Sequence, residues 1–346
     1  MTLNDSSWYG YNGITSFSSM NYESLAILQR DLGIPGNEIN SFYYTNNTPI
    51  YNLMFNLKYI LGNPHDYKHY QNILIGNNIE VYENKYNLDL LYGVNKNIKN
   101  YQLTSYDPID NQNNFIKEST GLENTLEKEK IISQEIIDKK DNITLVKYTF
   151  TNNLDTNYFY NNDGNIEFFI INNTLYYTNN IYETINYTFP QIYYYNSESY
   201  TEKKLINFTD TNDFIEIYVG YNYYNNDTIN IYSLNETKFQ KAYNILKNNE
   251  AEIIKFQENK IEATINLKEE KTIYTSIPYD KGWTVTIDGN EVDTYKIADS
   301  LLGFDVSSGN HTIILKYYPN NMSLGILISA SSLISIMYLH KKRKVI

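Results

Sequence analysis

One stretch near the C-terminus restricts the architecture of this chain more than any other feature. From Met322 to Leu339 the sequence carries no formal charge, and four consecutive basic residues, 341–344, follow directly after His340. About eighteen apolar or small residues lie at the short end of what spans a hydrocarbon core roughly 30 Å thick. The stretch therefore predicts a transmembrane helix at 321–340 and a basic cytoplasmic tail at 341–346.

The basic tail predicts the orientation of this helix. Short loops rich in Lys and Arg stay in the cytoplasm, so we expect the residues before 321 to lie on the extracytoplasmic side of the membrane. Residues 1–30 lack a basic start followed by an apolar stretch and a small-residue cleavage site, so no signal peptide is recognisable there. We therefore expect membrane helices from a missing upstream part to export this region. A tail-anchored protein with a cytosolic body is the alternative, although it would put the basic tail on the wrong side.

Composition indicates an acidic, folded head attached to that anchor. The 346 residues, 42% of them hydrophobic, can form one or two cores. All 40 acidic residues precede position 321, whereas four of the 28 Lys and Arg residues follow it. The head therefore has 40 acidic residues against 24 basic ones, and its surface is negatively charged. A negative surface repels nucleic acid, so we expect no nucleic-acid partner. The absence of cysteine excludes disulfides, cysteine-ligated zinc and a thiol nucleophile.

Four segments show the apolar spacing and end signals of helices. Glycines follow three of them and favour a left-handed exit from the helix. The predicted helices are 22–32 after the N-cap candidate Asn21, 49–61 after Thr48, 108–119 after Asp107, and 236–247. We expect the last of these to be a short amphipathic helix among strands.

Most of the remaining sequence alternates with period two, which is typical of strands. Examples are 79–82, 145–150 and 214–219. Asp288-Gly289 favours a tight hairpin turn between strands 283–287 and 291–296. Residues 307–310 predict a second hairpin, between 301–306 and 311–318, and the Lys- and Glu-rich segment 123–141 is expected to be a linker or an exposed helix.

The expected fold is therefore α+β and mainly β. A small N-terminal α/β portion is expected at 1–125, and a β-sandwich-like domain with a helical insertion at 126–320. Both portions are expected to be extracytoplasmic.

Asp280 and Trp283 are the candidate sugar-binding residues. An indole face can stack on pyranose C–H bonds while a carboxylate accepts hydroxyl hydrogens. A tryptophan at the start of a strand is more often part of the core, and this alternative stays open. The signal is therefore a weak one.

Two further patterns suggest metal sites weakly. His65 and His69 are four residues apart and could share a metal on a helix. Asn63-Pro64 favours a turn there instead, so we expect exposed polar residues. Residues 161–165 resemble a calcium loop, but they begin with an amide and lack the closing glutamate. We predict no cofactor, no metal and no catalytic residue in this chain.

Several segments, in the same order, resemble one known family. They are Ser16–Ser19, Asp31–Gly33, Thr48–Pro49, Leu57–Ile60, Tyr82–Asn84, Asp107–Gly121, Ser276–Trp283, Val285, Asp288–Gly289, Leu302–Phe304 and Gly309–Ile313. Together with the C-terminal span, they resemble the extracytoplasmic region and last transmembrane helix of bacterial YfhO-family membrane proteins. The middle, from about 150 to 235, agrees only in pattern.

The resemblance implies a polytopic, glycosyltransferase-like protein. Such a protein would use polyprenyl-phosphate sugars to decorate cell-envelope polymers such as teichoic acids. Its acidic catalytic residues are expected on an early external loop, and both this loop and its many membrane helices precede the region that matches here. The resemblance therefore carries over no catalytic residue.

Two functions are compatible with these observations. In the first, the chain is the non-catalytic extracytoplasmic portion of a glycosyltransferase-like protein, inactive alone, and serves in acceptor binding or scaffolding. Its partners would be the lipid bilayer, a cell-envelope glycopolymer and a polytopic membrane partner that supplies the missing helices. In the second, it is a stand-alone single-pass surface module that binds carbohydrate or protein. An upstream reading frame that encodes many hydrophobic spans would favour the first.

Overall fold

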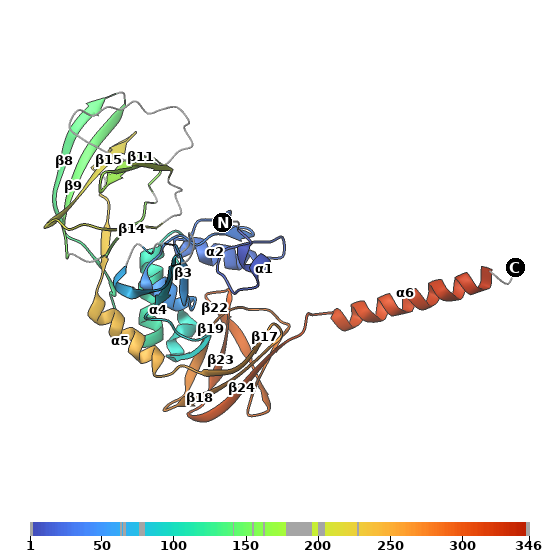
Figure 1. Ribbon diagram of the computed structural model, residues 1–346. Coiled ribbons are helices and arrows are strands. Elements are labelled where there is room, and N and C mark those ends of the chain that lie inside the picture. Colours follow the sequence, from blue (N-terminus) through green and yellow to red (C-terminus); the bar gives the residue numbers. More distant parts are fainter. Residues whose placement is uncertain are drawn as a thin grey trace.

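The computed structural model describes residues 3–62, 64, 67–75, 80–140, 142–153, 156–161, 163–177, 196–199, 205–226 and 228–343. They form an N-terminal part that contains most of the helices, two β-sandwiches, and a C-terminal helix that projects from the body (Figure 1). The fold is mainly β with several antiparallel sheets, as the sequence predicts.

The helices begin and end largely where local signals place them. Their bounds are α1 Asp5–Tyr9, α2 Glu23–Asp31, α3 Pro49–Met54, η1 Tyr67–His69, η2 Lys96–Asn100, α4 Pro108–Thr120, α5 Glu236–Lys247 and α6 Met322–Arg343. Thr48 caps α3 by accepting a hydrogen bond from the Tyr51 amide at 3.2 Å, and Asp107 caps α4 through the Asp110 amide at 3.3 Å. Gly121 ends α4 at φ 81°, a conformation that favours glycine.

Two details of the helix prediction are wrong. The residue before α2 is Tyr22, without a side-chain cap, and Asn21 instead donates from its amide to the Asn40 carbonyl at 2.8 Å. Helix α3 ends at Met54 rather than at 61, because Asn56 adopts a left-handed conformation and Tyr59–Leu61 form strand β3. In β3 the middle residue is buried between two exposed ones, which is strand periodicity.

The N-terminal part has its own core between helices and short strands. Two small antiparallel sheets belong to it: β1 Ser16–Phe17 with β2 Ser41–Phe42, and β3 with β5 Glu80–Asn84 and β4 Tyr70–Ile75. Leu28, Tyr51 and Phe115 from α2, α3 and α4 are fully buried there. Phe239 of α5 joins the same core, although α5 lies more than a hundred residues further along the chain. The predicted strand 79–82 is observed as β5, and Ile79 lies outside the described residues.

The first β-sandwich packs a six-stranded sheet, in the order β13-β12-β11-β15-β9-β8, on a four-stranded sheet, β14-β10-β16-β7. The strands are β7 Leu126–Lys128, β8 Ile131–Lys140, β9 Ile143–Thr151, β10 Thr156–Phe159, β11 Ile166–Ile171, β12 Thr174–Tyr177, β13 Asn196–Ser199, β14 Ile206–Thr209, β15 Phe214–Tyr221 and β16 Ile231–Leu234. Phe150, Phe169 and Ile217 of the larger sheet meet Phe159 and Ile231 of the smaller one in a shared core.

The expectation of a linker or exposed helix at 123–141 is wrong. This segment forms β7 and the long strand β8, which pairs with β9 at one edge of the six-stranded sheet. Its Lys and Glu side chains fit an edge strand, because charges there discourage pairing with a further chain.

The second β-sandwich packs the sheet β17-β18-β24-β20-β21 on the sheet β22-β23-β19-β6. The strands are β6 Leu91–Val94, β17 Glu252–Gln257, β18 Lys260–Leu267, β19 Lys271–Pro278, β20 Trp283–Ile287, β21 Asn290–Val292, β22 Thr294–Ile297, β23 Leu301–Val306 and β24 Gly309–Tyr317. Val285, Phe304 and Leu315 are fully buried between the sheets. Strand β6 reaches this sandwich from the N-terminal third of the sequence by pairing with β19. The expected boundary at 125 stays a prediction.

The first predicted hairpin is confirmed in part, because the return strand expected at 291–296 is divided between β21, which pairs with β20, and β22, which pairs with β23 in the other sheet. Asp288 at φ 51° and Gly289 at φ 86° form the tight turn between β20 and β21. The second is wrong: β23 pairs with β19 and β22, whereas β24 pairs with β18 and β20. Residues 307–308 therefore connect the two sheets of the sandwich. Both strands bury apolar side chains in the core between these sheets.

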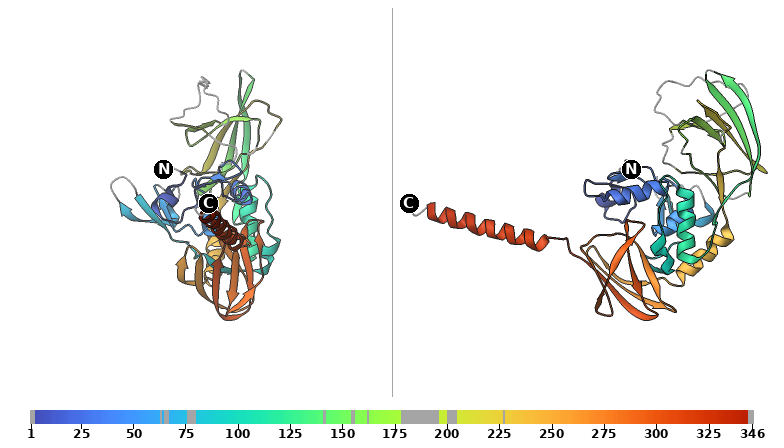
Figure 2. Two further views of the ribbon diagram at one scale, coloured as in Figure 1. Left: turned by 90° about the vertical axis from the view of Figure 1, so that its right-hand side faces the viewer. Right: turned by 180° about the vertical axis from the view of Figure 1, so that it is seen from behind.

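Helix α6 lies where the sequence predicts a helix and extends away from the second sandwich (Figure 2). Its side chains from Met322 to Tyr338 are exposed. Within the part of the chain that the structure describes, no helix meets both the length and the apolar character that crossing a bilayer requires. The helical conformation is confirmed, and the membrane span predicted at 321–340 is not supported by this finding.

Candidate functional site

A hollow of about 790 Å³ lies on the six-stranded sheet of the first sandwich. Amides, carboxylates and two aromatic rings dominate its lining. We call it the sheet groove, and the residues that line it are Ile170, Asn172, Asn173, Thr209, Asp210, Thr211, Asn212, Asp213, Phe214, Glu216 and Tyr218.

The periodicity of β15 places side chains in the sheet groove. Ile215, Ile217 and Val219 are fully buried in the sandwich core. Successive side chains of a strand point to opposite faces, so the alternate residues Phe214, Glu216 and Tyr218 line the outer face. Phe214 is 52% exposed there, a large apolar ring open to solvent.

The rim of the sheet groove is shaped by side chains that bond to the backbone. Asn172 begins the turn between β11 and β12 at φ 48°, and its amide donates to the Thr209 carbonyl at 2.7 Å. The Asp210 carboxylate accepts from the backbone amide and the side-chain amide of Asn212, at 2.9 and 2.7 Å. Asn152 donates to the Asp210 and Asn212 carbonyls at 2.9 and 2.6 Å. These bonds hold the loop 209–213 in one shape without an apolar core of its own.

The electrostatics of the sheet groove are mainly negative. Asp210, Asp213 and Glu216 line it, and Lys147 pairs with Glu216 at 2.5 Å. The hydrogen bond to Glu216 raises the pKa of Lys147, so its positive charge is secure at neutral pH. The Lys147 ammonium also lies 5.7 Å from the centre of the Tyr218 ring. The arrangement offers hydrogen-bond acceptors beside aromatic faces, which suits a polyhydroxylated ligand.

Asp280 and Trp283 lie elsewhere, on the second sandwich. The Asp280 carboxylate accepts a hydrogen bond from the Tyr22 hydroxyl at 2.5 Å and from the Gly282 amide at 2.6 Å. Trp283 begins β20, packs partly on the sandwich core, and its ring centre lies 5.0 Å from that of Tyr317. These contacts are structural, and sugar binding by this pair stays a prediction.

The structure describes only part of the histidine pattern, because His65 and Asp66 lie outside the described residues. His69 was expected to be exposed, and this is wrong. Its ring is buried against Tyr86 and Phe239, and its Nε2 lies 2.8 Å from Glu236 Oε1. Burial alone would raise the pKa of Glu236, but the bonds and charges of His69 and Lys68 lower it below its ordinary value. The pair joins the N-terminal part to the start of α5.

The structure describes only part of each metal pattern. Among the residues described, no three His, Cys, Asp or Glu side chains come together as a metal ion would require. In the segment 161–165, Asn162 lies outside the described residues, and the Asn161 and Asp163 side chains accept backbone hydrogen bonds within their own turns.

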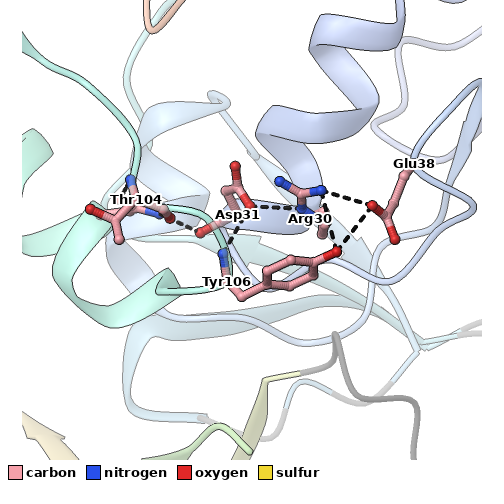
Figure 3. A network of polar contacts seen from close by, with 6 residues as sticks. Arg30, Asp31, Glu38, Thr104 and Tyr106 are labelled. Atoms are coloured by element: carbon pink, nitrogen blue, oxygen red, sulfur yellow. Dashed lines mark hydrogen bonds and ion pairs between the residues drawn. The ribbon is translucent and has the colours of Figure 1, made fainter. Parts of the chain in front are cut away.

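A buried charge network surrounds Arg30 at the end of α2 (Figure 3). Arg30 donates to Asp31 and to Glu38, both at 2.7 Å, and its guanidinium lies 4.2 Å from the centre of the Tyr106 ring. Asp31 also accepts from the Tyr106 amide at 3.0 Å. Tyr160, which directly follows β10 of the first sandwich, packs partly on the core of the N-terminal part. Burial raises the pKa of its phenol, and the negative charge of Asp31 raises it further.

His311 of β24 connects Asp288 and Ser307, which lie on two exposed turns of the second sandwich, in a row of polar contacts that sequence reasoning missed. His311 Nδ1 lies 2.7 Å from Asp288 Oδ2, and its Nε2 lies 3.2 Å from Ser307 Oγ. The order matches that of a nucleophile triad. Ser307 and Asp288 are both exposed, however, so water would surround a reaction there, and we interpret the row as a bridge between two turns.

Comparisons with known proteins agree with the resemblance seen in the sequence. The model of a family described as bacterial membrane protein YfhO matches residues 1–329. A Bacillus subtilis (strain 168) protein, described as uncharacterized protein YfhO, is 28% identical over 116 residues, which are 33% of this chain and 14% of that protein. The chain therefore aligns with only a small part of this relative. No solved structure matches the chain.

Proposed function

The chain belongs to the YfhO family of bacterial membrane proteins, and we propose that it forms the extracytoplasmic, saccharide-binding head of a glycosyltransferase-like member. The sheet groove carries the proposal. It is a preformed hollow that places the Phe214 and Tyr218 rings beside three carboxylates and three amides. A sugar could stack its C–H face on the rings and donate its hydroxyl hydrogens to the carboxylates and amides.

The negative charge of the sheet groove favours the sugar substituents of a cell-envelope polymer over its phosphate backbone. Asp210 and Asp213 bring negative charge to the rim, and the positive charge of Lys147 is already paired with Glu216. A phosphate backbone would be repelled there, whereas a neutral or cationic sugar would not. The proposed ligand is therefore the sugar substituent of an acceptor, with catalysis supplied by membrane helices of a partner.

We propose that α6 anchors this head in the membrane, with the basic tail in the cytoplasm. Helix α6 exposes eight large apolar side chains that fall at all angles around its axis, at 3.6 residues per turn. They are Leu324, Ile326, Leu327, Ile328, Leu333, Ile334, Ile336 and Met337, each at least 54% exposed. In the sequence the uncharged run continues through Leu339. Large apolar side chains on every side of a helix favour an apolar surrounding.

Binding measurements on the detergent-solubilised full chain test the sheet groove. Oligosaccharides of neutral hexoses or N-acetylhexosamines are expected to bind, and an unsubstituted glycerol phosphate oligomer is not. Phe214→Ala should weaken saccharide binding by roughly two- to tenfold, which corresponds to about 0.5–1.5 kcal/mol for a lost aromatic contact.

Phe256→Ala is the matched control. Phe256 is 53% exposed on β17 of the second sandwich, and Phe214 is 52% exposed. Replacement of Phe256 by Ala should leave saccharide binding unchanged. Equal losses in both variants, or preferential binding of the phosphate oligomer, would overturn the assignment. A stand-alone surface module would also bind sugar, but it would not co-purify from membranes with a polytopic partner.

A further inference from the structure

The N-terminal segment exposes a group of large apolar side chains. Trp8, Tyr9 and Met20 are 82%, 78% and 83% exposed, and Phe17 is 49% exposed. The Phe17 amide donates to Asn4 Oδ1 at 2.9 Å, which holds β1 beside the start of α1. Single exposed apolar residues are ordinary, whereas a group of this kind marks an interaction surface. We call these four residues the N-terminal patch.

The N-terminal patch lies close to the base of α6. Tyr22, two residues after Met20, donates to Asp280, and Asp280 accepts from the Gly282 amide. The Gly282 carbonyl in turn accepts from the Tyr318 amide at 2.9 Å, four residues before α6 begins. Helix α1 lies on the side of the body from which α6 departs, and the view from behind agrees (Figures 1 and 2).

The patch differs in charge from the rest of the head. Asp5 is the one formal charge between residues 3 and 22, although the chain has 40 acidic residues before position 321. Anionic lipid headgroups repel an acidic surface, but a neutral aromatic surface can approach them. Trp and Tyr are the residues that favour the boundary between membrane and water, because their rings are apolar and their N–H or O–H groups can bond to water.

We propose that the N-terminal patch inserts into the headgroup layer of the same bilayer that α6 enters. This inference rests on the proposed function, because it requires α6 in that bilayer. Two attachment points, the helix and the patch, hold the head in one orientation, so that the sheet groove faces a fixed direction. The side chains project separately from α1, from β1 and from the turn at Met20, which suits a deformable headgroup layer.

Tryptophan fluorescence tests the insertion directly, because the chain has two tryptophans and the Trp283→Phe variant retains only Trp8. This variant is placed at full length in phospholipid nanodiscs. We expect a blue-shifted Trp8 emission that loses intensity when the lipids carry bromine near the headgroup end of their acyl chains. A water-exposed emission without quenching would overturn the proposal. A blue shift without lipid quenching would overturn it in favour of a protein contact.

Three further variants keep the outcome interpretable. The emission spectrum of Trp8→Phe is subtracted from that of the unmodified chain, and the difference gives the Trp8 spectrum even if Trp283→Phe does not fold. In the variant without either tryptophan, Tyr223→Trp places a reporter at a 64% exposed site on the first sandwich, where no quenching is expected. In the same background, Leu333→Trp in α6 should be quenched by bromine at mid-bilayer. Quenching at position 333 but not at Trp8 would reject only the insertion of the N-terminal patch. If position 333 is not quenched either, the proposal that α6 enters the bilayer is rejected as well.

Discussion

Arginine occurs at only two positions in this chain, 30 and 343, among 28 Lys and Arg residues. The geometry around Arg30 explains why a lysine could not make the same contacts. One guanidinium bridges Asp31 and Glu38 with separate N–H groups while its plane lies over the Tyr106 ring. A lysine ammonium is a compact charge and cannot reproduce this fork. The sequence contains the arginine, but its partners at 38 and 106 become neighbours only in the fold.

Arg30→Lys should therefore destabilise the chain. The Asp31 side chain is 3% exposed and that of Arg30 is 11% exposed, so a carboxylate that loses its guanidinium hydrogen bond would remain buried. We expect a loss of about 1–3 kcal/mol in the free energy of unfolding, measured by urea denaturation in detergent. Lys96→Ala is the control, because its pair with Glu270 is half exposed on both sides and should contribute less than about 1 kcal/mol. Equal effects of the two changes would contradict this account of Arg30.

The bridge between His311 and Asp288 should depend on pH. The hydrogen bond to Asp288 raises the pKa of His311 above 6.5. The Thr312 amide, with the His311 ring, lowers the pKa of Asp288 below 3.8. Stabilisation by His311 is thus complete below pH 6.5 and is lost as pH rises through its raised pKa. Stabilisation by Asp288 is present above pH 3.8 and is lost as pH falls through its lowered pKa.

An NMR titration of the imidazole signals tests this, with His311→Gln to assign the signal of His311 among the four histidines. The expected titration midpoint lies above 6.5 in the unmodified chain and moves down in Asp288→Asn. A midpoint that Asp288→Asn leaves unchanged would show that the carboxylate does not hold the ring.

Among the secondary-structure elements, helices were easier to predict than strand pairing. Thr48, Asp107 and Gly121 mark helix ends through hydrogen bonds to residues nearby in the chain, so these helix ends can be predicted from the sequence. Pairing is not local: β6 pairs with β19, which lies more than 170 residues away, and β23 and β24 join different sheets. The charged segment 123–141 was misassigned because an edge strand can carry the polar pattern of a linker.

The sheet groove was missed for a similar reason. Its rim comes from the turn at 172–173 and the loop at 209–213, which β11 and β15 bring together. One signal was present in the sequence. The strand 214–219 alternates buried Ile and Val with Phe, Glu and Tyr, so its outer face was predictable, although its hollow was not.

Packing within the six-stranded sheet gives a further prediction. A Cβ atom on Gly220 of β15 would lie 2.3 Å from Cε1 of Phe168, whose ring is buried on β11. Gly220→Ala should force that ring aside and lower the unfolding free energy by about 1–3 kcal/mol in urea denaturation. Gly164→Ala is the control, because no atom lies within 4 Å of the added carbon. A neutral Gly220→Ala would contradict the close contact between the two strands.

For the whole molecule, the two sandwiches and the helical part form one body from which α6 projects (Figure 1). The N-terminal part joins the second sandwich through β6 and through Tyr22 with Asp280. It joins the first sandwich where the Leu205 amide donates to the Gly33 carbonyl at 3.2 Å. The account requires this body outside the cell and the basic tail inside.

Site-specific labelling tests that orientation most directly, because the chain contains no cysteine. Single cysteines are introduced at Tyr223, which is 64% exposed on the first sandwich, and at Val345 in the tail. A membrane-impermeant maleimide is then added to intact protoplasts. The account predicts that Tyr223→Cys reacts in intact protoplasts and that Val345→Cys reacts only after permeabilisation. The reverse pattern would contradict it.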